Sequence, residues 1–387
     1  MTKFHSILHV GKYFPPRHGG IETFMSQLMN EQVKEGHKVS AIVHADSPLS
    51  SDGVYNWRGA DIYEAKSFGQ IAFVPVAPNY FNVLIKVLRE KSPDIIHIHM
   101  PNIAPFWLIF LKHFFARQSH VIIHWHSDVL GAAPDFKIKL LYPLYRIFEK
   151  YLLLKADRIL VTSQNYLDSS KPLAAFKNKC NVIPLGLKIN KLDTVTKDIK
   201  GNAAFSLIMI GRLTYYKGHS VALRALSDLR DKGVTFRLTI IGDGELRSSL
   251  EQLSQKLNLD SCINWLGHVS DEQKTKYLQE SELLLLPSVE RTEAFGVVLL
   301  EAANASVPCI VSDVYGSGMT SVIVDGVNGR IVKNNDVSAL TSVLLTLSSN
   351  RASCLEMGQY GYSRLVEKFD IKKVSKRITS IYDEINI

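Results

Sequence analysis

The sequence has few cysteines and no segment apolar enough to span a membrane. The 387 residues include four scattered cysteines, Cys180, Cys262, Cys309 and Cys354, and no Cys-x-x-Cys pair. This pattern favours reduced, buried thiols over a disulfide framework or a zinc site. The longest apolar candidate, residues 103–116, contains a proline and a lysine and is shorter than the roughly 20 residues of a membrane span. We expect no cleavable signal peptide, because the first residues form a short strand pattern.

Common phosphate-binding motifs are also missing. Neither half contains Gly-x-Gly-x-x-Gly after its first expected strand, and Gly-x-x-x-x-Gly-Lys-[Ser/Thr] occurs nowhere. These absences argue against a dinucleotide dehydrogenase and a P-loop NTPase. The chain also lacks Asp-x-Asp. A divalent cation is therefore not needed to explain phosphate binding, and we expect neither a metal nor a cofactor.

The composition is that of a globular protein whose positive charge is unevenly distributed. Hydrophobic residues make up 46% and charged residues 21% of the chain, which is ordinary for a soluble protein. Residues 1–186 carry 21 Lys and Arg against 14 Asp and Glu, a net +7, whereas residues 187–387 carry 24 against 23, a net +1. Such an excess on one half indicates an anionic partner, which could be a membrane surface, a nucleic acid or a phosphorylated substrate.

The densest basic stretch is Phe136–Lys155, in which Lys and Arg are interleaved with Tyr, Phe and Leu. Such a segment could lie on anionic lipid with its aromatic side chains at the level of the headgroups. The alternative is a core-packing helix with a basic outer face. We expect an anionic membrane surface as the partner, and no nucleic acid.

Short apolar runs alternate with helical patterns along the chain. The expected strands are 7–10, 39–43, 95–98, 121–125, 159–161 and 182–183, then 206–210, 236–241, 263–265, 283–286 and 309–311. The expected helices are 22–35, 80–90, 105–115, 136–155 and 164–170, then 220–231, 245–257, 271–280, 296–305, 337–348 and 352–369. This alternation predicts an α/β protein with parallel, doubly wound sheets. We expect two Rossmann-like domains, 1–186 and 187–369, which face a cleft, with a polar linker near 188–202 and a C-terminal helix, 370–387, that packs back on the first domain.

The most informative segment runs from Glu293 to Glu301 and follows the apolar run Leu283–Leu286, which is ended by proline. It predicts a strand, a loop that carries Glu293, a glycine, and a helix that carries Glu301 two turns inside. In a parallel sheet such a loop lies at the carboxyl end of its strand, where ligands bind. The free amides at the helix start, around Gly296, Val297 and Val298, suit a phosphate. An amphipathic helix with one capping and one solvated acid is the alternative.

Two further loops have the character of phosphate-binding loops. Gly19 and Gly20 follow the first expected strand and could bring backbone amides against a phosphate at the start of the next helix. Arg212 and Lys217 lie in the loop after the first strand of the second half, Gly211-Arg-x4-Lys-Gly218. These two cations could hold a diphosphate, the arginine in a bidentate manner and the lysine as a point charge. Singly, each loop could be an ordinary turn with surface cations.

Together these motifs resemble the family 4 retaining glycosyltransferases of the GT-B fold. The resemblance spans nearly the whole chain through six ordered motifs: Gly19-Gly-Ile-Glu22, His124-Trp-His-Ser-Asp128, Asn181-Val-Ile-Pro-Leu-Gly186, Gly211-Arg-x4-Lys-Gly218, Ile241-Gly-Asp-Gly244 and Glu293-Ala-Phe-Gly-x4-Glu301. Within that family the chain is similar to bacterial O-antigen and polysaccharide mannosyltransferases.

The resemblance implies a role for each candidate residue. Arg212 and Lys217 would neutralise the donor diphosphate, and Glu293 would accept from hydroxyls of the donor sugar. His126 would contact the sugar or the developing oxocarbenium on the acceptor side, and these four residues are the catalytic set. Glu301 would accept from the ribose hydroxyls. The remaining donor-binding positions are Gly19, Gly20, His268, Val269, Phe295, Gly296, Val297 and Val298, of which His268 and Val269 would border the base.

The resemblance predicts a hexosyltransferase of lipopolysaccharide O-antigen biosynthesis. Mannose from GDP-mannose is the favoured donor and a UDP-sugar the second choice, with a polyprenyl-diphosphate-linked saccharide as acceptor. The enzyme is then expected in the cytoplasm, peripheral at the inner face of the cell membrane.

Two rival functions use other features of the sequence. His97, His99, His124 and His126 form two His-x-His pairs at strand ends and could ligate zinc in a metal-dependent hydrolase. That reading leaves Arg212, Lys217 and the two glutamates unexplained. A non-catalytic sugar-binding regulator on the same fold is the second rival.

Overall fold

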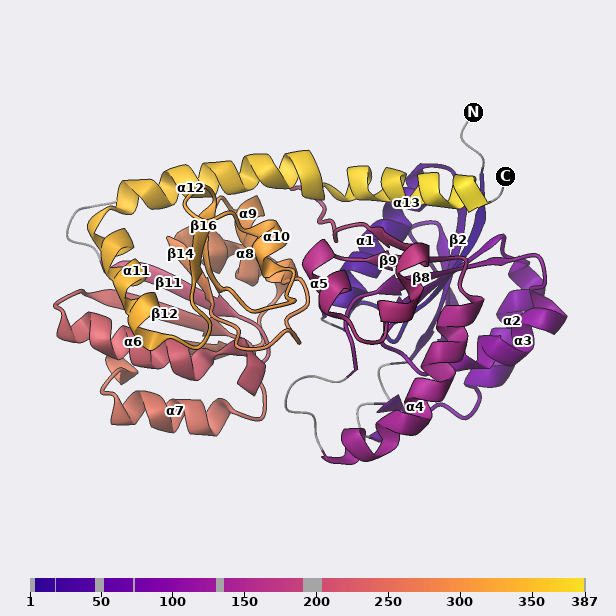
Figure 1. Ribbon diagram of the computed structural model, residues 1–387, viewed down its shortest axis with the longest axis horizontal. Helices are drawn as coiled ribbons and strands as arrows, with labels where there is room; N and C mark the ends of the chain where they lie inside the picture. Colours follow the sequence, from indigo (N-terminus) through magenta and orange to yellow (C-terminus); the bar gives the residue numbers. More distant parts are fainter. Residues whose placement is uncertain are drawn as a thin grey trace. The chain divides into compact units, whose positions relative to one another are not determined.

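The protein forms two α/β units (Figure 1). The structure is a computed structural model in which residues 4–17, 19–45, 52–71, 74–129, 136–190 and 204–385 are described. The N-terminal unit comprises Met1–Lys188 together with Asp370–Ile387, and the C-terminal unit comprises Ile189–Phe369. The expected linker falls largely on residues 191–203, which lie outside the described part of the chain.

An eight-stranded sheet forms the centre of the N-terminal unit. Its strands are β1 (Ser6–Val10), β2 (Lys38–His44), β3 (Gly53–Trp57), β4 (Ala60–Ala65), β7 (Ile95–Met100), β8 (His120–Trp125), β9 (Arg158–Val161) and β10 (Cys180–Val182). They lie in the order β10-β9-β8-β7-β1-β2-β4-β3, and all pairs are parallel except β3 with β4. Every residue of β7 is buried, as expected for a parallel strand covered on both faces. A separate small pair is formed by β5 (Gln70–Ile71) and β6 (Val74–Pro75).

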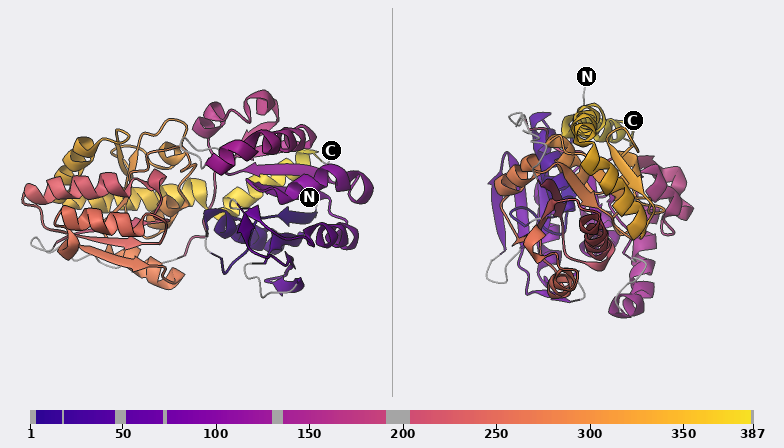
Figure 2. Two further views of the ribbon diagram at one scale, coloured as in Figure 1. Left: turned by 90° about the horizontal axis from the view of Figure 1, so that it is seen from below. Right: turned by 90° about the vertical axis from the view of Figure 1, so that its left-hand side faces the viewer.

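Six α-helices surround this sheet in the described residues. They are α1 (Gly20–Lys34), α2 (Tyr80–Lys91), α3 (Leu108–Phe115), α4 (Phe136–Lys155), α5 (Gln164–Ser169) and α13 (Ile371–Ile385). Although α13 is last in the chain, it packs along α1 (Figures 1 and 2). A Cβ atom on Gly186 would lie 2.9 Å from the Cα atom of Ile371. Glycine at this position therefore permits the close approach of α13.

The C-terminal unit contains a six-stranded, wholly parallel sheet. Its strands are β11 (Phe205–Ile210), β12 (Phe236–Ile241), β13 (Ile263–Gly267), β14 (Leu283–Leu286), β15 (Cys309–Ser312) and β16 (Gly329–Val332), in the order β13-β12-β11-β14-β15-β16. The helices are α6 (His219–Asp231), α7 (Arg247–Lys256), α8 (Asp271–Glu280), α9 (Val297–Asn304), α10 (Met319–Val322), α11 (Val337–Ser349) and α12 (Arg351–Arg364). A π-helical turn, Leu365–Phe369, follows α12.

The prediction of two parallel-sheet α/β units is confirmed, with local differences. The sequence did not indicate the strands β3 and β4, the small pair β5 and β6, the strand β16 or the short helix α10. The helix α9 begins at Val297, so Glu301 lies just over one turn inside the helix and not two. Among the described residues, no helix combines the length and apolar character that crossing a membrane requires.

Candidate functional site

The strand order of the C-terminal unit places two loops side by side. After β11, the chain adds β12 and β13 on one side of that strand. It then returns to the other side of β11, where β14 lies. The loops that follow β11 and β14 therefore flank the position where ligands bind in doubly wound sheets. A hydrogen bond from the Val289 amide to the Tyr216 carbonyl, 2.8 Å long, joins the two loops.

Glycine is required where these loops meet. Gly218 has φ 72°, and a Cβ atom there would lie 1.9 Å from the carbonyl oxygen of Pro287. Any larger residue would separate the loops. The preceding residue, Lys217, is thereby held against the loop that carries Glu293.

Lys217 and Glu293 form a buried ion pair. The Lys217 Nζ atom lies 2.5 Å from Glu293 Oε2, and the two side chains are only 11% and 10% exposed. Burial lowers the pKa of the Lys217 ammonium, but the nearby charge of Glu293 and the contact with Tyr216 more than offset this, so that pKa lies above its ordinary value. The lysine is therefore charged at neutral pH.

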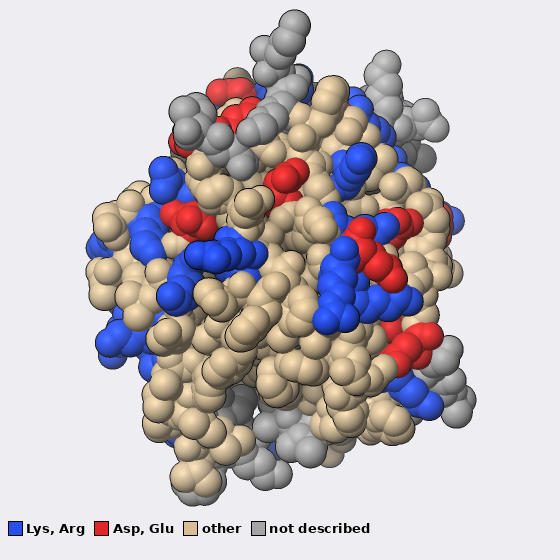
Figure 3. Space-filling view, turned by 90° about the vertical axis from the view of Figure 1, so that its right-hand side faces the viewer, with Lys and Arg blue, Asp and Glu red and all other residues tan. Residues whose placement is uncertain are grey.

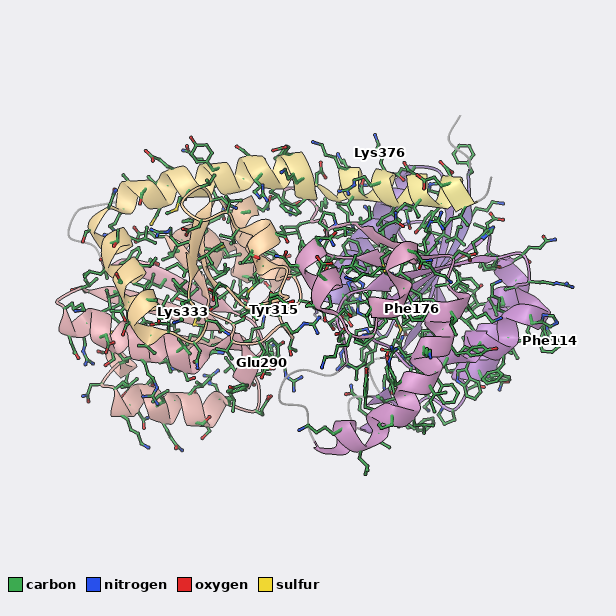
Figure 4. All side chains as sticks on the ribbon, in the orientation of Figure 1. Phe114, Phe176, Glu290, Tyr315, Lys333 and Lys376 are labelled. Carbon is green, nitrogen blue, oxygen red and sulfur yellow. The ribbon has the colours of Figure 1, made fainter. Side chains whose placement is uncertain are left out.

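The loop that carries Glu293 is fixed by the next loop along the sheet. The Ser317 hydroxyl donates to the carbonyl of Glu293 at 2.5 Å, and the Gly318 amide donates to the carbonyl of Ala294 at 2.7 Å. Figure 4 labels Glu290 and Tyr315, which lie on these two neighbouring loops. Because its backbone is held on both sides, the Glu293 carboxylate has a defined position.

The helix α9 begins directly after the loop that carries Glu293. Gly296 has φ 81° and offers no side chain to cap the helix, so the first amides, of Val297 and Val298, have no partner within the helix itself. The side chain of Phe295 is buried and packs edge-on against Phe369, with ring centroids 6.1 Å apart. Phe295 therefore anchors the loop in the core through its side chain.

Glu301 faces a cation that the sequence did not single out. Lys274, on α8, lies 2.9 Å from Glu301 Oε1 and 3.0 Å from Asp271 Oδ1. Burial lowers the pKa of Lys274, but Glu301 and Asp271 raise it above the ordinary value. A lysine three residues after an aspartate is common on solvated helices, so this spacing does not mark Lys274 as part of a site.

The remaining donor-side candidates are more exposed. Arg212 is 57% exposed, and its guanidinium lies 3.4 Å from Glu245 on the loop after β12. The structure therefore gives Arg212 and Lys217 different acidic partners. His268 and Val269 follow β13, where His268 is exposed and Val269 is half-buried.

In the N-terminal unit, Gly19 and Gly20 begin α1. The Thr23 amide donates to the Gly19 carbonyl at 2.9 Å, which closes the first turn. Gly19 is extended, and a Cβ atom there would meet the Glu22 carboxylate. Because glycine has no side chain, the space over the first turn of α1 stays open at this position.

His126 belongs to a buried group of five imidazoles, which we call the histidine network: His9, His97, His99, His124 and His126. They lie on β1, on β7 and at the end of β8, and these three strands are neighbours in the sheet. The rings of His124 and His126 stack with centroids 4.5 Å apart, and Phe24 of α1 packs edge-on against both. Burial lowers the pKa of His126 to about 3, so this imidazole is neutral.

Two protein-family models match the chain, one for each unit. The model described as Glycosyltransferase Family 4 matches residues 18–191, and the model described as Glycosyl transferases group 1 matches residues 197–364. The chain belongs to the GT-B glycosyltransferases. The resemblance drawn from the sequence motifs is thereby confirmed.

Relatives of this glycosyltransferase cover nearly its whole length. O-antigen chain mannosyltransferase C of Escherichia coli is 28% identical over 385 residues, which is 97% of this chain and 97% of that protein. A D-rhamnosyltransferase of Pseudomonas aeruginosa is 28% identical over 372 residues, which is 94% of this chain and 92% of that protein. Sucrose-phosphate synthase of Thermosynechococcus elongatus has a TM-score of 0.79 at 18% identity, with 98% of both chains covered, and shares the fold.

The metal site of the alternative function, a metal-dependent hydrolase, would consist of members of the histidine network. One ring nitrogen from each of His97, His99 and His124 lies within 4.8 Å of the others. However, His97 Nε2 and His124 Nδ1 are joined by a hydrogen bond of 3.2 Å, and His99 Nδ1 bonds His126 Nε2 at 3.0 Å. A divalent cation would have to replace these bonds, and the three residues His97, His99 and His124 include no carboxylate that would offset its charge. The chemistry of the group fits hydrogen bonding better than metal ligation.

Proposed function

We propose that this glycosyltransferase is a retaining hexosyltransferase of O-antigen or related surface polysaccharide synthesis. It moves a hexose from a nucleotide-diphosphate sugar to a saccharide acceptor, with GDP-mannose as the first donor to test and UDP-sugars as the second. The support is the near-complete coverage by relatives named as an O-antigen chain mannosyltransferase and a D-rhamnosyltransferase.

The Lys217–Glu293 pair is the observation that carries the proposal. Its 2.5 Å separation at the switch point of the sheet supports a site that combines a cation with a carboxylate. The loop that carries Glu293 leads directly into α9, whose first amides are those of Val297 and Val298. Cleavage of the C1–O bond leaves negative charge on the departing diphosphate. Lys217 and these amides stabilise that charge, and Glu293 accepts hydrogen bonds from sugar hydroxyls.

The same set of residues accounts for retention without a covalent intermediate. In the proposed step, the acceptor hydroxyl attacks C1 on the face from which the diphosphate leaves. The departing phosphate takes the hydroxyl proton, and the C1–O bond to the diphosphate breaks as the new glycosidic bond forms. Glu293 pairs with Lys217 and binds the sugar in this proposal. The departing phosphate therefore acts as the base.

A lipid-linked acceptor is supported by an apolar stripe on the surface of α4. Leu140, Leu144, Ile147, Tyr151 and Leu154 are each between 46% and 68% exposed. Their spacing of three or four residues puts them on one side of the helix. Single exposed apolar residues are ordinary, but a continuous stripe marks an interaction surface.

The neighbouring helix extends this surface. Trp107, Phe110 and Phe114 are also exposed on and just before α3, which packs against α4, and Figure 4 shows Phe114 at the outer edge of the unit. A groove between the two helices is lined by Lys112 and Lys155, among others. Figure 3 shows blue basic side chains on either side of a broad tan area at this end. Apolar side chains next to cations suit the interface of an anionic bilayer.

A donor panel tests the proposed activity. Purified enzyme is screened by thermal shift against nucleotide sugars, and each binder is then assayed for transfer to membrane extracts that contain lipid-linked saccharides. We expect one donor to raise the melting temperature and to support transfer, since a ligand at 100 times its Kd adds about 2.7 kcal/mol to the stability. Binding of nucleotide sugars without any transfer would instead support the non-catalytic sugar-binding function.

A further inference from the structure

The histidine network continues beyond its five imidazoles into two hydrogen-bonded arms that meet at Gln32 of α1. In the first arm, Gln32 Oε1 lies 2.7 Å from His9 Nε2, and His9 Nδ1 lies 3.0 Å from His99 Nε2. His99 Nδ1 in turn lies 3.0 Å from His126 Nε2. The arm therefore runs from the amide of Gln32 to the ring of His126.

The second arm leads to the C-terminal helix. Gln32 Nε2 donates to the hydroxyl of Tyr382 at 3.3 Å, and that hydroxyl bonds His97 Nδ1. His97 Nε2 then lies 3.2 Å from His124 Nδ1. Gln32 is fully buried, so its amide bridges α13 and the histidines without competition from solvent.

The amide of Gln32 sets the position of each proton in the first arm. A carbonyl oxygen can only accept a hydrogen bond, so His9 carries its proton on Nε2. A neutral imidazole has one donor and one acceptor, so His9 Nδ1 accepts from His99 Nε2. By the same rule, His99 Nδ1 accepts from Nε2–H of His126. The Nδ1 atom of His126 therefore carries a lone pair.

That nitrogen is the open end of the first arm. His126 Nδ1 is buried and has no hydrogen-bond partner among the described residues. An acceptor left without a partner in a buried position is costly, which points to a ligand that supplies the hydrogen bond. A lone pair accepts a hydrogen bond from a hydroxyl and offers no proton to a carbonyl or phosphate oxygen.

We propose that Gln32 is a positioning residue that fixes His126, through His9 and His99, in the Nε2–H form, so that Nδ1 accepts a hydrogen bond from a sugar hydroxyl. The role of the hydroxyl rests on the proposed sugar transfer, whereas the proton arrangement does not. Tyr382 holds the orientation of the Gln32 amide. Reversal of that amide would reverse every bond of the arm and turn Nδ1 of His126 into a donor.

The proton arrangement is tested first, by nitrogen-15 NMR of the full-length protein labelled at histidine. In the wild type we expect His126 and His99 to show protonated Nε2 and bare Nδ1 throughout the neutral range. In Gln32→Met, which keeps the length of the side chain but removes the amide, we expect His126 to populate both forms. Gln27→Met is the matched control on the same helix, because Gln27 bonds the Lys188 amide and lies outside the network.

Transfer kinetics test the consequence. Gln32→Met should lower kcat roughly tenfold, the effect of one hydrogen bond in the transition state, with the KM of the nucleotide sugar unchanged. Tyr382→Phe, a smaller change that keeps the core packing, should cause a weaker loss of the same kind. Gln27→Met should leave both constants unchanged.

The possible failures are distinguishable. A wild-type His126 with its proton on Nδ1, or a Gln32→Met variant with unchanged His126 signals and unchanged kcat, would overturn the inference and leave the sugar transfer intact. Absence of transfer with every donor, combined with the expected signals in wild type and Gln32→Met, would overturn the proposed function and the hydroxyl role but keep the positioning of His126.

Discussion

The ammonium of Lys217 lies 2.5 Å from the carboxylate of Glu293, and both side chains are almost fully buried. The first residue follows β11 and the second follows β14, so the pair forms only when the two central strands are in place. In the protein alone the two charges neutralise each other. In the proposed site, Lys217 would pair with the donor diphosphate and Glu293 would accept hydrogen bonds from the sugar hydroxyls.

Lys217→Ala and Glu293→Ala should each reduce kcat by about 10²–10³, the typical loss for one group that stabilises developing charge. Each should also destabilise the fold, because removal of one partner leaves the other charge buried and unpaired. The double variant Lys217→Ala/Glu293→Ala should recover stability but not activity. Thermal unfolding and initial rates distinguish the two effects, and a fully active Lys217→Ala enzyme would show that the diphosphate site is misplaced.

The Lys274–Glu301 pair should influence donor binding more than the chemical step. Ribose contacts are made equally in the ground and transition states, so Glu301→Ala should raise the donor KM with little change in kcat. Lys274→Ala should have the same effect, because the lysine orients the carboxylate at 2.9 Å. The control is Lys276→Ala on the same helix, whose side chain is 75% exposed. A large drop in kcat for Glu301→Ala would instead assign this acid to catalysis.

Sequence patterns predicted five of the six strands of the C-terminal sheet and the loop after β14, because the relevant information is local. The strand Leu283–Leu286, the glycine before α9 and the two acids all lie within 19 residues. The Lys217–Glu293 contact was foreseen only as two separate motifs, since the strand order that joins them depends on the whole sheet.

The histidine network could not be predicted, because its members are far apart in the chain. Gln32 and Tyr382 are separated by 350 positions and resemble ordinary polar residues on amphipathic helices. The two His-x-His pairs were visible in the sequence, but their spacing is equally compatible with metal ligation. Only the register of β1, β7 and β8 shows that the rings bond one another.

Removal of divalent metals should leave the activity unchanged. The histidines that could ligate zinc are joined to one another by hydrogen bonds, and Lys217 supplies the charge that a metal would bring to the diphosphate. We expect substoichiometric metal in the purified protein and equal rates before and after treatment with EDTA. Stoichiometric zinc, together with activity that returns only when zinc is added back, would favour the metal-dependent function.

The histidine network should make the protein sensitive to acid. Burial lowers the pKa of His9 to about 4 and that of His126 to about 3, and it holds the pKa of His97 well below the ordinary 6.5. The unfolded chain therefore binds more protons below pH 6.5, so the stability contributed by these groups is present above this pH and is lost as the pH falls toward 4.

Each such imidazole contributes up to about 1.4 kcal/mol per pH unit to this loss. Chemical denaturation at several pH values between about 7.5 and 5 measures how steeply the free energy of unfolding falls as the pH falls. This range extends about one to two units on either side of 6.5. His97→Phe should make it shallower, whereas substitution of the exposed His268 should not. A stability that is flat across this range would mean that the imidazoles are solvated.

Membrane binding provides the last prediction, and the structure decides which cations of α4 should be tested. Lys139 and Lys150 are exposed on α4, but the Arg146 guanidinium bonds the buried Glu149 at 2.8 Å. Arg146 is therefore part of the fold, and the side chain of Lys137 lies outside the described residues. Lys155, which lines the groove beside α3, is therefore the third target, together with Lys139 and Lys150.

Two sets of variants separate apolar from electrostatic binding. Leu144→Ser/Ile147→Ser should weaken co-sedimentation with vesicles rich in phosphatidylglycerol at all salt concentrations, because each apolar side chain contributes about 1.5–3 kcal/mol when buried. Neutralising Lys139, Lys150 and Lys155 should weaken binding mainly at low salt, at about 1 kcal/mol for each charge. Val54→Ser, on the exposed strand β3, is the control. Equal binding of wild type and Leu144→Ser/Ile147→Ser would assign the apolar stripe to something other than a bilayer.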